Sequence, residues 1–84
     1  MKKPIKAQPG NYKAWYHQGI ALKNTGRWAE AIAAFDKAIA SKSDYDRAWQ
    51  NRGIALSDLG RFEEAIASYD MALKLQPGNR EAWY

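Results

Sequence analysis

The chain repeats itself with a period of 34 residues, and this periodicity restricts its fold more than any other feature. The stretch AWYHQGIALKNTGRW at residues 14–28 returns as AWQNRGIALSDLGRF at residues 48–62. Between residues 12–45 and 46–79, 14 of the 34 positions carry the same amino acid. Such a period indicates a stack of supersecondary units, each of which buries its apolar face only against its neighbours.

Each unit is predicted to form two helices separated by one glycine. Apolar residues recur at helical spacing before and after Gly26, and the second unit repeats this pattern around Gly60. Glycine adopts the left-handed conformation that closes a helix at little steric cost. Gly26 and Gly60 are therefore expected to end the first helix of each unit.

Two further glycines fall inside the predicted helices, at Gly19 and Gly53. A glycine inside a helix costs about 1 kcal/mol relative to alanine. Its recurrence one period later indicates that the partner helix approaches closely there, and we expect this contact at the small Ala31 and Ala65.

The segment SKSDYD at residues 41–46 joins the two units without the Pro-Gly pair found at residues 9–10 and 77–78. It retains three residues suited to capping a new helix, namely Ser43, Asp44 and Asp46. An ordinary bend is therefore predicted. The alternative is one continuous helix, which would separate the hairpins and favour exchange between chains.

Both ends of the chain are expected to lie within repeats, because QPGN occurs at residues 8–11 and again, two periods later, at residues 76–79. The expected division is an end of a preceding partial repeat at 1–11, full repeats at 12–45 and 46–79, and the start of a third repeat at 80–84.

Composition excludes several kinds of chemistry. The chain has no cysteine and a single histidine, His17, so disulfides and thiolate metal sites are ruled out and no cofactor is expected. The acidic residues occupy capping, helix-dipole or pairing positions, as Asp70 does four residues before Lys74. No catalytic residue is predicted.

Charge and hydropathy disfavour a nucleic-acid or membrane partner. The formal net charge is +4, from 13 basic and 9 acidic residues, but three of the lysines lie within residues 1–6 and the rest of the chain is nearly neutral. Apolar runs are far shorter than the roughly 18 residues of a membrane span. Trp15, Trp49 and Trp83 recur one period apart, which favours packing over base stacking. We expect a soluble, cytoplasmic protein.

The sequence closely resembles the tetratricopeptide repeat. Trp15, Gly19, Ala31 and Phe35 carry the pattern in the first unit, and Trp49, Gly53, Ala65, Tyr69 and Pro77 carry it in the second. Leu22 and Leu56 stand where the family has Tyr, Gln18 and Arg52 where it has Leu, and Ser43 where it has the first Pro. The resemblance implies an all-α, right-handed superhelical solenoid of antiparallel helix-turn-helix repeats.

The resemblance also implies that the first helix of each repeat faces a concave groove that holds a partner peptide. The residues of this chain carried onto that groove are Lys13, Tyr16, His17, Ile20, Lys23, Asn24, Arg47, Gln50, Asn51, Ile54, Ser57 and Asp58. Tyr12, Tyr16 and Ile20 are spaced four residues apart, so they are expected to form an exposed apolar strip among cations unless something covers it.

The resulting hypothesis is a non-catalytic protein-interaction scaffold that binds an apolar or mildly acidic peptide. One subgroup of the family clamps a chaperone's C-terminal carboxylate with Lys and Asn, but Tyr16, Ile20 and Glu81 stand where several of those residues are expected. The alternative is a self-assembling module whose exposed repeat ends drive oligomerisation.

Overall fold

The computed structural model describes residues 11–75, which contain four helices and no strand. In chain order these are α1 (Asn11–Asn24), α2 (Trp28–Ser41), α3 (Asp46–Asp58) and α4 (Phe62–Lys74). The expected partial repeats at 1–11 and 80–84 lie, apart from Asn11, outside the described residues. Within residues 11–75, no helix is long and apolar enough to cross a membrane.

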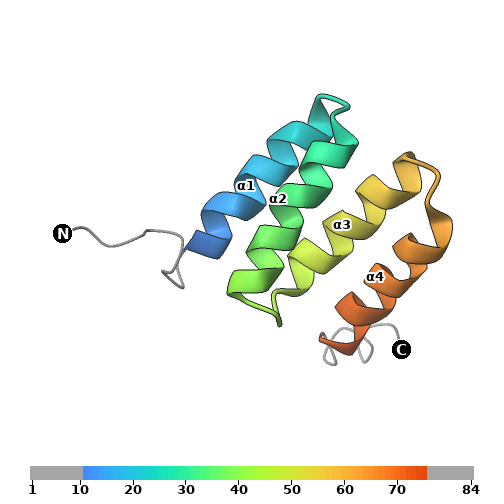
Figure 1. Ribbon diagram of the computed structural model, residues 1–84. Helices are drawn as coiled ribbons and strands as arrows, with labels where there is room; N and C mark the ends of the chain where they lie inside the picture. The colour runs from blue at the N-terminus through green and yellow to red at the C-terminus, as the bar shows by residue number, and fades with distance from the viewer. Residues whose placement is uncertain (1–10, 76–84) are drawn as a thin grey trace, which may run out of the picture.

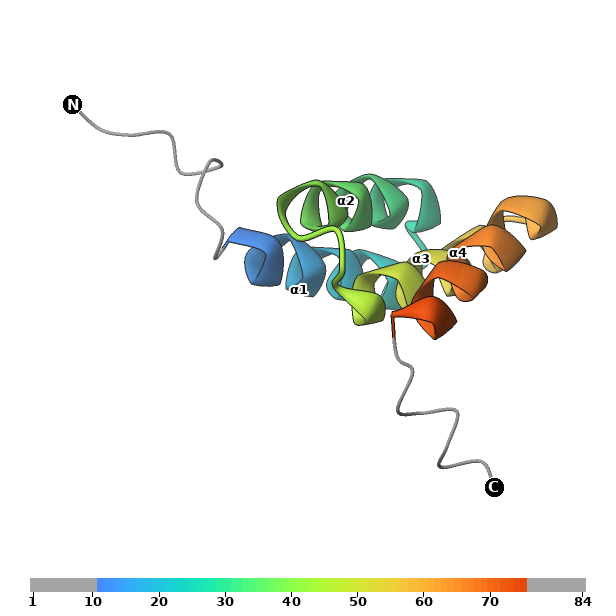
Figure 2. The ribbon, with the colours of Figure 1, turned by 90° about the horizontal axis from the view of Figure 1, so that it is seen from below.

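The helices form two antiparallel hairpins, α1–α2 and α3–α4, and α2 packs against α3 (Figure 1). Viewed from below, the hairpins follow one another along the molecule, with α1 and α4 at opposite ends (Figure 2). This is the all-α helical-repeat arrangement that the 34-residue period predicts.

The turn inside each hairpin is closed by a glycine in the left-handed region, as predicted. The φ angle is +81° at Gly26 and +87° at Gly60. Immediately after each glycine, the backbone N–H of Arg27 or Arg61 donates to the carbonyl oxygen of Leu22 or Leu56, at 2.9 Å in both turns. The two hairpins therefore reverse direction by the same mechanism.

Gly19 and Gly53 do lie where the partner helix approaches, but the partner residues differ from those expected. A Cβ at Gly19 would lie 2.5 Å from Cε1 of Phe35, and one at Gly53 would lie 2.8 Å from Cε1 of Tyr69. The nearest atoms belong to a ring from the middle of the second helix in each hairpin, and not to the expected Ala31 and Ala65.

The two units are joined by a bend, as predicted, since α2 ends at Ser41 and α3 begins at Asp46. The N-cap position of α3 is occupied by Tyr45, which makes no side-chain capping hydrogen bond, and the expected capping residue Asp44 pairs with Lys42 at 3.0 Å. The indole Nε1 of Trp49 donates to the carbonyl oxygen of Ser43 at 2.9 Å. A bond from the following helix thus holds the bend.

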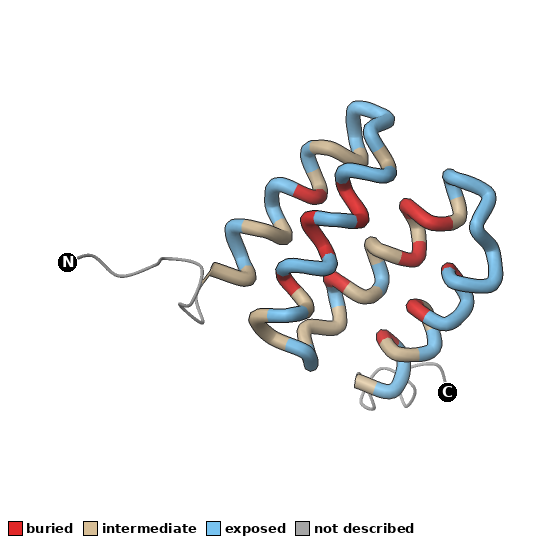
Figure 3. Tube along the Cα trace, viewed as in Figure 1, coloured by how far each residue is buried: buried red, intermediate tan, exposed pale blue. Residues whose placement is uncertain are grey.

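Buried residues are concentrated where the helices face one another (Figure 3). Ile32 of α2 lies among Ala55 and Leu56 of α3 and Ala65 of α4, with Trp28 and Tyr69 packed against this cluster. Because the cluster draws side chains from both units, it fixes how the second hairpin sits on the first.

Arg52 makes polar contacts beside this apolar cluster, the inter-repeat cluster. Nε of Arg52 lies 2.7 Å from Oδ1 of Asp36 on α2, and Nη1 of Arg52 donates to the fully buried hydroxyl of Ser68 on α4, also at 2.7 Å. Arg52 replaces the usual leucine of the repeat pattern and connects three helices.

Replacing Gly19 by Ala is expected to destabilise the protein, because the new methyl group would overlap the ring of Phe35. Overpacking of this kind costs about 1–3 kcal/mol, which outweighs the gain in helix propensity. Urea denaturation measures the loss. Adding Phe35→Leu to Gly19→Ala should make the alanine less costly than it is in the wild-type background. Equal costs in both backgrounds would contradict the steric account.

Candidate functional site

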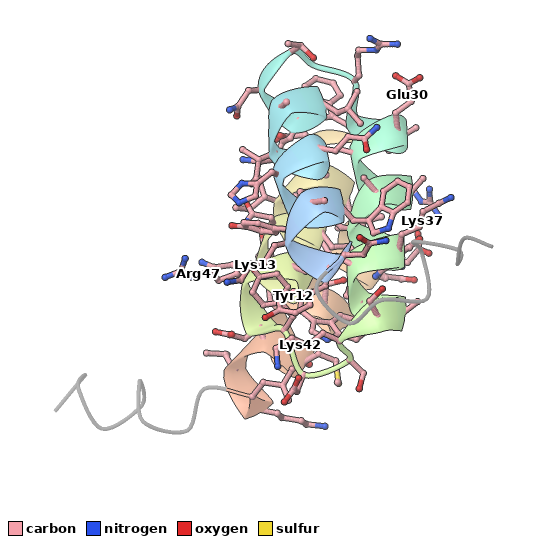
Figure 4. The ribbon with its side chains drawn as sticks, turned by 90° about the vertical axis from the view of Figure 1, so that its left-hand side faces the viewer. Tyr12, Lys13, Glu30, Lys37, Lys42 and Arg47 are labelled. Carbon is pink, nitrogen blue, oxygen red and sulfur yellow. The ribbon has the colours of Figure 1, made fainter. Side chains whose placement is uncertain are left out.

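The twelve residues predicted to line a peptide groove all lie on α1 and α3, and we call them the first-helix face. None of them is fully buried. The six that are exposed are Lys13, His17, Asn24, Arg47, Gln50 and Asp58, and the other six are half-buried. Lys13 and Arg47 project from the same side of the molecule, whereas Glu30 and Lys37 project from the other side (Figure 4).

A hydrogen bond joins the two repeats across this face. Nδ2 of Asn51 donates to the hydroxyl oxygen of Tyr16 at 3.1 Å and to the carbonyl oxygen of Arg47 at 3.0 Å. The structure therefore brings together a residue of α1 and a residue of α3 that are 35 positions apart. These hydrogen bonds hold the side chains of Asn51 and Tyr16 in place.

The apolar strip expected on α1 is covered in part by a residue that the sequence interpretation did not assign to the site. The ring of Tyr45, in the bend between α2 and α3, lies edge-on to Tyr12 and to Tyr16, with centroids 4.9 and 5.1 Å apart. Burial, with a smaller contribution from Tyr16, raises the pKa of the Tyr45 hydroxyl above its ordinary value of 10.0. Tyr12 and Tyr16 are consequently half-buried rather than exposed.

The sequence carried only a weak signal for Tyr45. It precedes the second repeat directly, and the equivalent position one period later is Asn79. Because the residue type does not recur, periodicity cannot identify it.

A lysine and a histidine border the rings of Tyr12 and Tyr16. Nζ of Lys42 lies 5.5 Å from the centre of the Tyr12 ring while pairing with Asp44. His17 packs edge-on against Tyr16, with 5.6 Å between the ring centroids. Within residues 11–75, no three His, Cys, Asp or Glu side chains are grouped closely enough to hold a metal ion.

A separate hollow of about 440 Å³ lies between α1 and α2, and helical spacing places it on a different side of α1 from the first-helix face. Trp15, Gln18 and Leu22 line it from α1, and Ala34 and Lys37 are among the residues that line it from α2. Nζ of Lys37 lies 4.8 Å from the centre of the Trp15 ring. Trp15, expected to pack as a repeat residue, is half-buried at the edge of this hollow.

Replacing Tyr16 by Phe removes the acceptor for Asn51 but keeps the ring. We expect a loss of about 0.5–1.5 kcal/mol in the free energy of unfolding, measured by urea denaturation. If the bond joins the repeats, Asn51→Ala should cost less in the Tyr16→Phe background than in the wild type. Additive costs would show that the two side chains are not coupled.

The hydrogen bond from Lys42, with its positive charge, lowers the pKa of the Asp44 carboxyl below its ordinary value of 3.8. Since folding favours the carboxylate, this contribution to stability is present at neutral pH and is lost as the pH falls from about 3.8 through the lower folded value. We expect NMR titration to show Asp44 titrating below 3.8, and Lys42→Met to return it towards that value, whereas Lys74→Met should leave it unchanged. An Asp44 pKa that does not respond to Lys42→Met would contradict the assignment.

Comparison with known proteins agrees with this arrangement. Sequence models of the tetratricopeptide repeat match residues 12–45 and residues 46–79. Two crystal structures of MamA are similar in fold: one has a TM-score of 0.75 and 30% sequence identity over 87% of this chain, and the other has 0.74 and 28% over 83%. The comparison with curated proteins returned no match.

The chain spans 42% and 38% of the lengths of these two MamA structures. The two adjacent family matches cover most of the chain, and the four helices repeat the hairpin of that family twice. The chain belongs to the tetratricopeptide repeat family.

Proposed function

We propose that this protein is a non-catalytic scaffold whose first-helix face binds a peptide segment of a partner protein. Tetratricopeptide repeats are in general protein-interaction modules, and two adjacent repeats match this chain. The observation that carries the proposal is the pairing of Tyr16 with Asn51, because it joins the first helices of both repeats into one surface.

The chemistry of this surface favours an apolar or mildly acidic peptide. Ile20 and Ile54 are half-buried and offer apolar contact, while Lys13 and Arg47 are exposed on the same side of the molecule. Exposed cations at the border of a site mainly steer an acidic ligand and raise its association rate. The half-buried apolar side chains then supply contact area.

Charge reversal of Lys13 and Arg47 to Glu should weaken binding of an acidic peptide about tenfold or more, mainly by slowing association. The probe is a peptide selected from a random display library on the wild-type protein, and calorimetry with stopped-flow mixing measures its affinity and association rate. Both residues are exposed, so the helix content should not change.

Lys37→Glu combined with Lys74→Glu is the matched control, because it reverses the same number of positive charges on α2 and α4, away from the first-helix face. It should leave affinity within about twofold of the wild type, since a surface charge away from the site contributes little. Equal weakening by the control and by charge reversal of Lys13 and Arg47 would assign the effect to overall charge and contradict the proposed face.

A second candidate function is self-assembly through the repeat ends, and one observation favours it. Phe62 and Ile66 on α4 are 62% and 58% exposed. Large apolar side chains grouped on one helix edge are typical of a surface that another chain or repeat covers.

A further inference from the structure

The outer edge of α4 repeats the edge of α2, but among the described residues nothing covers it. Ile32 on α2 is 7% exposed because α3 and α4 enclose it, whereas its equivalent Ile66 is 58% exposed. Likewise Trp28 packs against the inter-repeat cluster, and its equivalent Phe62 is exposed. The outer side of α4 is drawn as exposed in Figure 3.

The opposite end of the molecule carries the receiving half of the same contact. Ala48 and Ala55 of α3 are fully buried, and their equivalents on α1, Ala14 and Ala21, are exposed. Leu56 is likewise fully buried in the inter-repeat seam, and its equivalent Leu22 borders the hollow between α1 and α2. The α4 end therefore projects the apolar side chains of Phe62 and Ile66. The α1 end offers a recess, the hollow between α1 and α2, which corresponds to the site that Ile32 fills between the two repeats.

The charges of the two ends are complementary. Helix α4 carries Glu63 and Asp70 against Lys74, with Glu64 already paired to Arg61, while the hollow is lined by Arg27 and Lys37 against Glu30. Pairing α4 with α4 would bring surfaces of the same net charge together, whereas pairing α4 with the hollow brings opposite net charges together.

We propose that the outer edge of α4 is a docking surface for a second copy of this chain, which seats its α1 and the adjoining hollow on Phe62 and Ile66. The contact repeats the register of α2 against α3, with Ile66 taking the place of Ile32. Such a head-to-tail interface is open, so chains add one after another. This inference rests on the self-assembly function proposed above and specifies its geometry.

The interface between copies lacks one polar contact that the interface inside the chain has. Arg52 pairs with Asp36 across α3 and α2, and the equivalent residues at the two ends are Gln18 and Asp70. The Asp70–Lys74 pair expected from the sequence is not formed, and no residue between 11 and 75 forms an ion pair with Asp70. Gln18→Arg should therefore strengthen association by restoring the missing pair.

The decisive experiment mixes two variants of the full chain. Ile66→Glu disables the projecting end and Ala21→Glu disables the recess, and both positions are exposed in a single chain, so folding should be retained. Ala29→Glu is the matched control, since the equivalent position in the second repeat, Glu63, already carries glutamate. Sedimentation velocity over a hundredfold concentration range, with circular dichroism as a check of folding, measures the result.

The wild type and Ala29→Glu should both form species that grow with concentration, and each disabled variant should be monomeric alone. A mixture of the two disabled variants should form a one-to-one dimer and nothing larger, because one intact projecting end and one intact recess remain. A mixture that stays monomeric while the wild type associates would overturn the head-to-tail geometry and leave self-assembly standing. A wild type that is monomeric throughout would overturn both.

The charge variants test the register independently. Gln18→Arg should lower the dissociation constant about three- to fivefold, since a partly exposed ion pair contributes up to about 1 kcal/mol. Adding Asp70→Asn should remove that gain. A gain that persists with Asp70→Asn would show that Gln18 and Asp70 do not meet, and would contradict the proposed register.

Discussion

The insertion of Ile32 between α3 and α4 is the contact on which the rest of the structure depends. Burying a side chain of this size contributes about 1.5–3 kcal/mol, and it does so here by joining residues of both repeats. A single helical hairpin of this length buries too little apolar surface to be stable alone. The side chain of Ile32 therefore both stabilises the pair of repeats and sets the angle between them.

The packing of Ile32 against α3 and α4 also brings together the two halves of the first-helix face. When α2 is seated against α3, α1 comes close enough to α3 for Asn51 to reach Tyr16, and the bend residue Tyr45 reaches the same ring. The rings of Tyr12, Tyr16 and Tyr45 pack together where the repeats meet, and Lys13 and Arg47 remain exposed. The first-helix face thus arises from two helices that make few direct contacts with each other, because a third helix holds both.

Within each hairpin, a large ring packs over a glycine. The sequence indicated a close helix approach at Gly19, but the assumption that a small residue meets another small residue led to Ala31. The structure instead places Phe35 over Gly19 and Tyr69 over Gly53. A ring has the length to cross the space between two helix axes, so the missing side chain on one helix is filled by a large one on the other. Arg52 also spans the space between helices, since its long side chain reaches both Asp36 on α2 and Ser68 on α4.

The sequence by itself determined the period, the four helices and the left-handed glycines at Gly26 and Gly60, because each of these follows from local spacing or backbone conformation. It favoured a bend between the repeats but left a continuous helix open, and the structure decided for the bend. The sequence also placed the first-helix face on α1 and α3. Only the tertiary structure decided that Asn51 donates a hydrogen bond to Tyr16 and that Tyr45 covers part of the apolar strip on α1. It also decided that the Asp44 carboxylate pairs with Lys42. These contacts depend on side-chain reach and on the angle between hairpins, which a repeating pattern of residue types does not encode.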